Sequence, residues 1–256
     1  MKLNFLGRGA AFFPEEGNTS AYFIDNNELF LIDCGESVYN KLVERELLKS
    51  INSINVMITH THSDHIGSLG TLIMHSYFKL KKELNIILPE NAKHLSNIKN
   101  YLTAVGCTEE MYKLVKETDF DKKYKTFQKT RYIETTHCDE LKSYSLIFKT
   151  PEGIVFYSGD SNQEQLIKRI IRIPNYGIPL NKLYIDTTSA NYPGNVHLYI
   201  GTLKEIIPED LKHLVYCMHF NNAESIDIAK KIGFQVVEVE PVPVKVQEST
   251  DENIHI

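Results

Sequence analysis

The chain has 256 residues, of which 42% are hydrophobic and 24% charged, so it is long enough to bury a substantial core. Its formal net charge of -5 argues against a protein that coats long nucleic acids, because such proteins carry a basic surface. A small phosphate substrate remains compatible with this charge, since bound metal ions reverse the local sign.

The cysteines and the N-terminal segment indicate a cellular compartment. The four cysteines form no C-x-x-C pair, and in a chain of this length they are typical of reduced, buried thiols in a cytosolic protein. They are Cys34, Cys107, Cys138 and Cys217. The N-terminus does not resemble a signal peptide, and no apolar run reaches the roughly 18 residues that a membrane-spanning helix needs. We expect a protein of the cytoplasm, without membrane contact.

The first half of the chain alternates between short apolar runs and helical patterns. Strands are predicted at residues 2–7, 20–26, 29–35, 54–60 and 85–89. Helices are predicted at 38–48 and 64–78, and residues 91–126 are predicted to be mostly helical.

The second half returns to strands and then alternates again. Strands are predicted at 130–137, 143–150, 153–160, 182–187, 213–219 and 234–240. Helices are predicted from about 163, from about 197 and at 223–233, with a Pro/Gly loop at 189–195. This order suits an α+β sandwich of two mixed sheets with helices outside. We expect one hydrolase domain over residues 1–240, followed by a polar, frayed tail at 241–256.

A cluster of metal-ligand residues follows the apolar strand that ends at Ile58. It has the spacing His60-x-His62-x-Asp64-His65. Histidine and aspartate are ligand types that zinc prefers. Four ligands from one turn cannot close comfortably around a single ion, but they can serve two ions a few ångströms apart. A solvated polar loop is the ordinary alternative for such a stretch.

Three more ligand-type residues each end a separate apolar strand. They are His137, Asp160 and His219. A lone histidine such as His137 is as often structural, and Asp160 could instead cap the helix that follows it. Three strands that all end in this way are hard to attribute to chance, and we expect these residues to complete the two metal sites.

In this order, the residues resemble the metallo-β-lactamase fold hydrolases over nearly the whole chain. The resemblance implies a four-layer αββα sandwich with the site at one edge of the two sheets, and two Zn²⁺ ions, with Mn²⁺ as an alternative. The implied ligands are His60, His62 and His137 for one metal, Asp64, His65 and His219 for the other, and Asp160 as the bridge.

Three segments place the chain in a branch of that superfamily. "LGRGAAF", "IDCGES" and "MHF" are similar to ribonuclease Z. The chain departs from that enzyme by an acidic N-terminal loop, "FFPEEGNTSAYF", by its negative charge, and by the lack of a long basic arm that grips tRNA.

"GNTSAYFI", "LIDCGESV" and "DTTSANYPGNVH" look most like the anti-Pycsar phosphodiesterases of phages and bacteria. This resemblance implies a homodimer that hydrolyses 3',5'-cyclic mononucleotides (cyclic CMP, UMP, AMP and GMP) to 5'-monophosphates. It would thereby counter cyclic-nucleotide antiviral signalling, a form of immune evasion, and would act on no long nucleic acid.

Beyond the metal cluster, two residues are candidates for proton transfer. With Asp64 in the metal cluster, His197 and Asp186 make up the predicted catalytic set. We expect His197 to protonate the leaving ribose oxygen, and Asp186 to orient it or a neighbouring ligand. Alternatively, His197 begins a helix and Asp186 is a plain turn residue at a strand end.

Substrate contacts are harder to predict. Asn18, Thr19 and Ser20 could bind phosphate or sugar, or they could cap the strand that follows them. Tyr101 and Tyr112 could stack on a base, although tyrosines at helical spacing are more often core or subunit contacts.

Three other functions remain open. An RNA 3'-endonuclease would share the metal chemistry but needs a long basic footprint. A thioester or lactone hydrolase of the same fold would leave Asp186 and His197 without a clear task. A protein that only sequesters nucleotides would need none of the hydrolytic chemistry.

Overall fold

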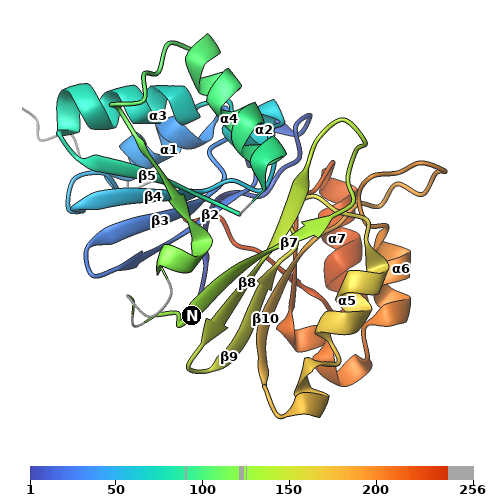
Figure 1. Cartoon of the computed structure of the whole chain (residues 1–256). Helices are drawn as coiled ribbons and strands as arrows, with labels where there is room; N and C mark the ends of the chain where they lie inside the picture. Colours follow the sequence, from blue (N-terminus) through green and yellow to red (C-terminus); the bar gives the residue numbers. More distant parts are fainter. Residues whose placement is uncertain (90, 121–123, 125, 242–256) are drawn as a thin grey trace, which may run out of the picture.

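The computed structural model describes residues 1–89, 91–120, 124 and 126–241 (Figure 1). The described strands form two six-stranded mixed sheets that face each other, with helices on the outer side of each. The predicted sandwich is therefore confirmed. Apart from Pro241, the tail predicted at 241–256 lies outside the described residues.

The first sheet has the strand order β1-β2-β3-β4-β5-β6. Its strands are β1 (Asn4–Gly7), β2 (Ser20–Asp25), β3 (Glu28–Ile32), β4 (Ser53–Met57), β5 (Glu83–Leu88) and β6 (Lys113–Lys116). The first three strands are antiparallel, and β3 to β6 are parallel.

The second sheet has the order β12-β11-β10-β9-β8-β7. Its strands are β7 (Lys129–Thr135), β8 (Ser143–Thr150), β9 (Gly153–Tyr157), β10 (Leu180–Asp186), β11 (Val215–Met218) and β12 (Gln235–Val236). Strands β9 to β12 are parallel, so the carboxyl ends of β9, β10 and β11 meet at one edge of the sheet.

The helices divide between the outer faces of the two sheets. Figure 1 shows α1 (Val38–Glu44), α2 (Ser63–Ile66), α3 (Leu69–His75) and α4 (Ala92–Ala104) beside the first sheet, and α5 (Glu164–Ile170), α6 (Ile200–Ile206) and α7 (Ala223–Ile232) beside the second. No helix among the described residues is long and apolar enough to cross a membrane.

Successive side chains along a strand point alternately into two different hydrophobic cores. In β3, Leu29 and Leu31 pack under the helices of the first sheet, whereas Phe30 and Ile32 pack between the sheets. This period of two is what a strand buried on both faces requires. A third core lies between the second sheet and its helices. Three cores separate four layers, and this rigid scaffold fixes the loops at the sheet edges.

The prediction of one continuous helix at residues 64–78 is wrong. The segment is split into α2 and α3 because the loop after β3 takes the backbone partners that a continuous helix would use. The Cys34 amide donates to the His65 carbonyl at 2.7 Å, and the Ser68 amide donates to the Cys34 carbonyl at 3.1 Å. The break leaves Asp64 and His65 on a single short turn.

The prediction that residues 91–126 are mostly helical is also wrong beyond α4. Residues 113–116 form β6, because β5 offers an open edge with which they pair in parallel. The helix expected from about His197 begins instead at Ile200. Residues 198–200 are held by hydrogen bonds between the Thr188 amide and the Leu198 carbonyl and between the Ile200 amide and the Thr188 carbonyl.

Candidate metal centre

The seven predicted ligands come together at one edge of the sandwich. His60 and His62 follow β4, Asp64 and His65 belong to α2, and His137, Asp160 and His219 follow β7, β9 and β11. All are buried except His62, which is partly exposed. The cluster is therefore formed by residues that follow strands of both sheets.

The first group joins three imidazoles. The Nδ1 atom of His62 lies 2.9 Å from the Nε2 atom of His60 and 3.2 Å from the Nε2 atom of His137. The three ring nitrogens all lie within 4.8 Å of one another.

The second group contains a carboxylate and two imidazoles. The Oδ2 atom of Asp64 lies 3.4 Å from the Nε2 atom of His65 and 3.3 Å from the Nε2 atom of His219. These atoms and one oxygen of Asp160 all lie within 4.8 Å of one another.

Asp160 stands between the two groups. Its Oδ2 atom is 3.2 Å from the Nε2 atoms of both His65 and His219. The same oxygen is 3.9 Å from the Nε2 atoms of His60 and His137. Asp160 thus has the position that a bridging carboxylate needs.

The spacing of these atoms fits metal coordination. Ligand atoms about 2.0–2.2 Å from a tetrahedral metal lie about 3.3–3.6 Å apart, close to the separations within the second group. The buried Nε2 atom of His65 also lies beside the carboxylate oxygens of Asp64 and Asp160 without forming a hydrogen bond of good geometry to either. A cation shared with these carboxylates would satisfy it. The clusters fit a binuclear metal site.

The ring orientations support the same interpretation. The Nδ1 atom of His65 donates to Asp33 at 2.8 Å, and that of His137 lies 3.4 Å from the Val196 carbonyl. Thr59 donates its hydroxyl to Asp33, so its oxygen can accept from the Nδ1 atom of His60 at 3.1 Å. A proton held on Nδ1 leaves the Nε2 lone pair of each ring free for a metal.

His62 is the exception, because its Nδ1 atom faces the cluster. Its Nε2 atom lies 3.7 Å from the sulfur of Cys138. The sequence predicts a buried thiol at Cys138, and this is wrong: the residue is partly exposed, because it follows His137 into the cavity beside the metal centre.

Asp33 is a supporting residue that the sequence analysis missed. Its carboxylate accepts hydrogen bonds from the Thr59 amide and hydroxyl, each at 2.7 Å, as well as from His65. The residue is fully buried and has a φ of 62°, a left-handed conformation in which aspartate is enriched. The available signal was an aspartate directly after the apolar strand β3.

Asp186 holds two histidines at once. Its Oδ2 atom accepts from the Nδ1 atom of His197 at 2.8 Å, and its Oδ1 atom faces the Nδ1 atom of His219 at 3.4 Å. The structure therefore brings Asp186 and His197 together beside the metal cluster. One ring nitrogen of His197 lies within 4.8 Å of His137 and Asp160 ligand atoms.

Burial and charge act in opposite directions on the ring pKa values. Burial lowers the pKa of His60 well below its usual value, which favours the neutral ring that a metal needs. Burial also lowers the pKa of His65, but the carboxylates of Asp160, Asp64 and Asp33 outweigh it and raise that pKa well above the usual value. A metal cation would replace the proton that these carboxylates attract.

His219 and His197 behave like His65. Burial lowers the pKa of His219, but Asp160, Asp186 and Asp64 raise it to about 10. Burial lowers the pKa of His197 as well, and Asp186 more than compensates, so that pKa is raised. The carboxylates make this edge a strong site for positive charge.

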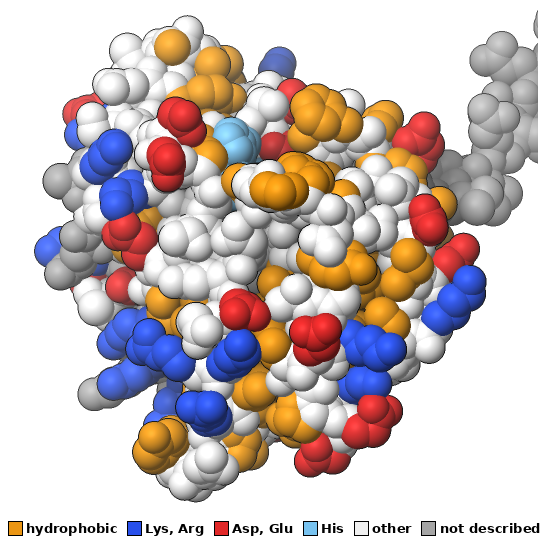
Figure 2. All heavy atoms as spheres, turned by 90° about the vertical axis from the view of Figure 1, so that its right-hand side faces the viewer, with side chains coloured by type: hydrophobic (Ala, Val, Ile, Leu, Met, Phe, Trp, Pro, Cys, Tyr) orange, Lys and Arg blue, Asp and Glu red, His pale blue; other side chains and the backbone are white. Residues whose placement is uncertain are grey.

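A cavity of about 540 Å³ opens beside the cluster. Its lining includes His62, His137, Asp160, His197 and His219. In Figure 2 a histidine side chain (pale blue) reaches the surface with hydrophobic side chains (orange) close to it. A volume of this size is ordinary for a small-molecule site.

The predicted substrate contacts lie elsewhere. Asn18, Thr19 and Ser20 are buried and do not line this cavity. Asn18 pairs with Ser37, and the hydroxyls of Thr19 and Ser20 donate to the backbone carbonyls of Gly9 and Asp33. These bonds favour the alternative that the three residues support the loop, and contact with substrate stays a prediction.

Tyr101 and Tyr112 pack with the core under the helices of the first sheet. The Tyr101 hydroxyl donates to the Ile66 carbonyl at 2.9 Å. Neither residue lines the cavity, so this structure does not support base stacking by either of them.

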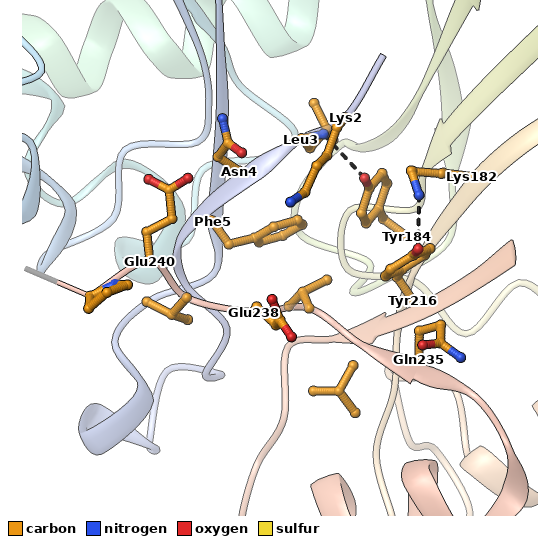
Figure 3. A pocket seen from close by; sticks show the side chains of 14 residues that line it. Lys2, Leu3, Asn4, Phe5, Lys182, Tyr184, Tyr216, Gln235, Glu238 and Glu240 are labelled. Atoms are coloured by element: carbon orange, nitrogen blue, oxygen red, sulfur yellow. Dashed lines mark hydrogen bonds between the residues drawn. The ribbon is translucent and has the colours of Figure 1, made fainter. Parts of the chain in front are cut away.

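A second cavity, of about 330 Å³, lies at the opposite end of β10 and β11. In Figure 3 Lys182 reaches the hydroxyl of Tyr216, and the Leu3 amide reaches that of Tyr184. These hydrogen bonds occupy both tyrosine hydroxyls, and none of the candidate metal groups of the described residues lies in this cavity.

The sequence matches one protein family, described as anti-Pycsar protein Apyc1, over residues 1–240. The anti-Pycsar protein Apyc1 of Bacillus phage BSP38 is 28% identical over 239 residues, which cover 86% of this chain and 89% of that protein. Ribonuclease Z of Methanocaldococcus jannaschii is 41% identical, but over 98 residues that cover 37% of this chain and 30% of that enzyme.

The solved structures agree on the fold. The metallo-β-lactamase fold protein YhfI from Bacillus subtilis superposes with a TM-score of 0.68 at 16% identity, over 94% of this chain and 96% of that one. At this identity the likeness establishes the metallo-β-lactamase fold and nothing finer.

Proposed function

The chain belongs to the anti-Pycsar protein Apyc1 family, and from this we propose that it hydrolyses 3',5'-cyclic mononucleotides to 5'-nucleoside monophosphates. In this way it would counter cyclic-nucleotide antiviral signalling. The observation that carries the proposal is the pair of ligand groups that share Asp160 and open, beside His197, into one cavity.

The two groups would hold two divalent ions, zinc or manganese. Such ions would supply a water nucleophile at neutral pH and neutralise the charge of the phosphodiester. Asp160 would set the distance between the groups, because one oxygen faces both of them. Asp33 and Thr59 would keep the rings of His65 and His60 in the orientation that exposes Nε2.

His197 would act as the general acid. Its Nδ1 atom is engaged by Asp186, which leaves Nε2 as the nitrogen that can give a proton to the departing ribose 3'-oxygen. Asp186 would hold the ring in place and stabilise its positive charge before the transfer. The ring of His197 lies 5.2 Å from that of His137 and 5.0 Å from that of His219, measured between centroids, so the acid stands directly beside both ligand groups.

The test is turnover of the four cyclic nucleotides by purified protein, zinc-loaded or stripped with a chelator, with products separated by chromatography. We expect several of them to give 5'-monophosphates only when metal is present. The Asp64→Ala/His65→Ala double variant should lose this activity. His213→Ala, at an exposed histidine outside the candidate metal groups of the described residues, should keep it.

One observation favours a second candidate, an RNA 3'-endonuclease. The local identity to ribonuclease Z exceeds that to the phage protein, although it covers a smaller part of the chain. Precursor tRNA, a lactone and a thioester therefore belong in the same assay. Metal-dependent cleavage of one of these, with no turnover of any cyclic nucleotide, would refute the phosphodiesterase proposal. Sedimentation of the same samples tests the homodimer that we also propose.

A further inference from the structure

We propose that Phe12 and Tyr192 hold the nucleobase of the substrate by stacking, and that they set base affinity without reading the base edge. This inference rests on the proposed function, since it concerns the same cavity. It assigns the part of the site that lies away from the phosphodiester.

The two aromatic rings are unusual for this chain in being exposed. Phe12 is 96% exposed and Tyr192 is 56% exposed, whereas most aromatic side chains lie in the cores. Both line the cavity that also contains His62, Asp160 and His197. Exposed apolar surface at a cavity mouth marks a binding site more often than chance.

The rings stand on ordered loops. Phe12 belongs to the segment between β1 and the short 3₁₀ turn at Pro14–Glu16, where the Ala10 amide donates to the Phe220 carbonyl at 2.8 Å. Tyr192 lies between β10 and α6, where the Asn195 amide donates to the Tyr192 carbonyl at 3.2 Å. Rings whose backbone is already fixed lose little entropy on binding.

Three polar side chains in this part of the cavity already form hydrogen bonds within the protein. The side-chain nitrogen of Asn195 donates to the Ala190 carbonyl at 2.9 Å, and its side-chain oxygen accepts from the backbone amide of His197 at 3.0 Å. The hydroxyl of Thr188 accepts from the Ala190 amide at 3.1 Å. The side-chain oxygen of Asn221 accepts from Ser225 at 2.8 Å.

A base at this position would therefore meet mostly apolar surface. Besides Phe12 and Tyr192, the lining here includes Ala10, Ala190 and Val196. Every base offers a π-face, so stacking on aromatic rings tolerates any of them. The metal cluster would fix the phosphodiester and the rings would fix the base.

The test compares substrates with and without a base. Phe12→Ala and Tyr192→Ala are assayed on cyclic AMP, cyclic CMP and ribose 3',5'-cyclic phosphate, which has no base. We expect each variant to raise the KM for both cyclic nucleotides by about 5- to 100-fold, the affinity that one stacking contact supplies. The kcat should change little, because stacking acts equally on bound substrate and transition state.

The controls separate stacking from other effects. The KM for the baseless substrate should be the same in all proteins. Tyr192→Phe keeps the ring and should behave like the natural protein. Tyr176→Ala removes an 82% exposed aromatic ring outside the cavity and should have no effect.

An equal rise of KM with and without the base would overturn the inference, as would an unchanged KM for the cyclic nucleotides. A change in sedimentation without a base-dependent KM would overturn it too, because the rings would then be a subunit contact. Failure of the proposed function is distinguishable, since in that case the natural protein itself turns over none of the three substrates.

Discussion

The polar groups at the two ends of the β10–β11 pair differ in how completely they are hydrogen-bonded. At the amino end, Lys182 donates to the Tyr216 hydroxyl at 2.8 Å and the Leu3 amide donates to the Tyr184 hydroxyl at 3.2 Å (Figure 3). At the carboxyl end, the buried Oδ1 atom of Asp186 and Nδ1 atom of His219 face each other at 3.4 Å without forming a hydrogen bond of good geometry.

This difference separates stability from function. Burying polar atoms whose hydrogen bonds are incomplete costs free energy, so the carboxyl end is not optimised for the folded state alone. The amino end, where partners are supplied, stabilises the fold. Because the same two strands carry both ends, substitutions at the two ends can be compared within one scaffold.

The largest expected effect is at the carboxyl end, for His197→Gln. Loss of a general acid lowers kcat by about 10²- to 10⁴-fold, and we expect this for the cyclic nucleotides. In a phosphodiester whose leaving group is p-nitrophenolate, that group departs without needing a proton. The kcat for such a substrate should therefore change far less. The measurement is kcat for both substrates, with metal content determined in parallel.

A loss of activity on both substrates would assign His197 a different role. One ring nitrogen of His197 also lies near ligand atoms of His137 and Asp160. An equal loss on both substrates, together with lost metal, would make His197 a ligand rather than an acid.

A smaller effect is expected for Asp33→Asn. Groups that orient a ligating histidine contribute about 10- to 100-fold to metal affinity or activity, and Asp33 holds the His65 ring at 2.8 Å. Asparagine tolerates the left-handed backbone at this position, so the fold should persist. Titration against a chelator should give metal binding weakened by that factor.

Asp25→Asn is the matched control. Asp25 is also a buried aspartate at a strand end, and it accepts from the Thr126 amide at 2.8 Å. It is not in any of the candidate metal groups, so its replacement should leave metal affinity unchanged. If Asp33→Asn also binds metal normally, Asp33 serves only the backbone at Thr59.

Asp33 shows which parts of the site the sequence alone can predict and which it cannot. That His60, His62, His137, Asp160 and His219 converge was predictable because each follows an apolar strand, and the ends of such strands meet at one edge. Asp186 also ends a strand, but its contact with His197, 11 residues later in a loop, does not follow from that pattern. Asp33 was missed because its role depends on a left-handed turn and on His65, which is distant in sequence. Strand β6 and the break between α2 and α3 were missed because pairing partners elsewhere in the chain decide them.

The smallest effect on activity is expected at the amino end, for Tyr184→Phe. The change leaves the buried Leu3 amide without its acceptor, which costs about 1–3 kcal/mol in the free energy of unfolding. Tyr216→Phe should cost less, because Tyr216 is only partly buried and water can replace its hydroxyl as the partner of Lys182. Urea unfolding of both variants measures the difference. Neither should change kcat, because neither residue lines the cavity beside the metal centre. A large loss of kcat in Tyr184→Phe would mean that β10 couples the two ends, because Asp186 lies two residues further along the same strand.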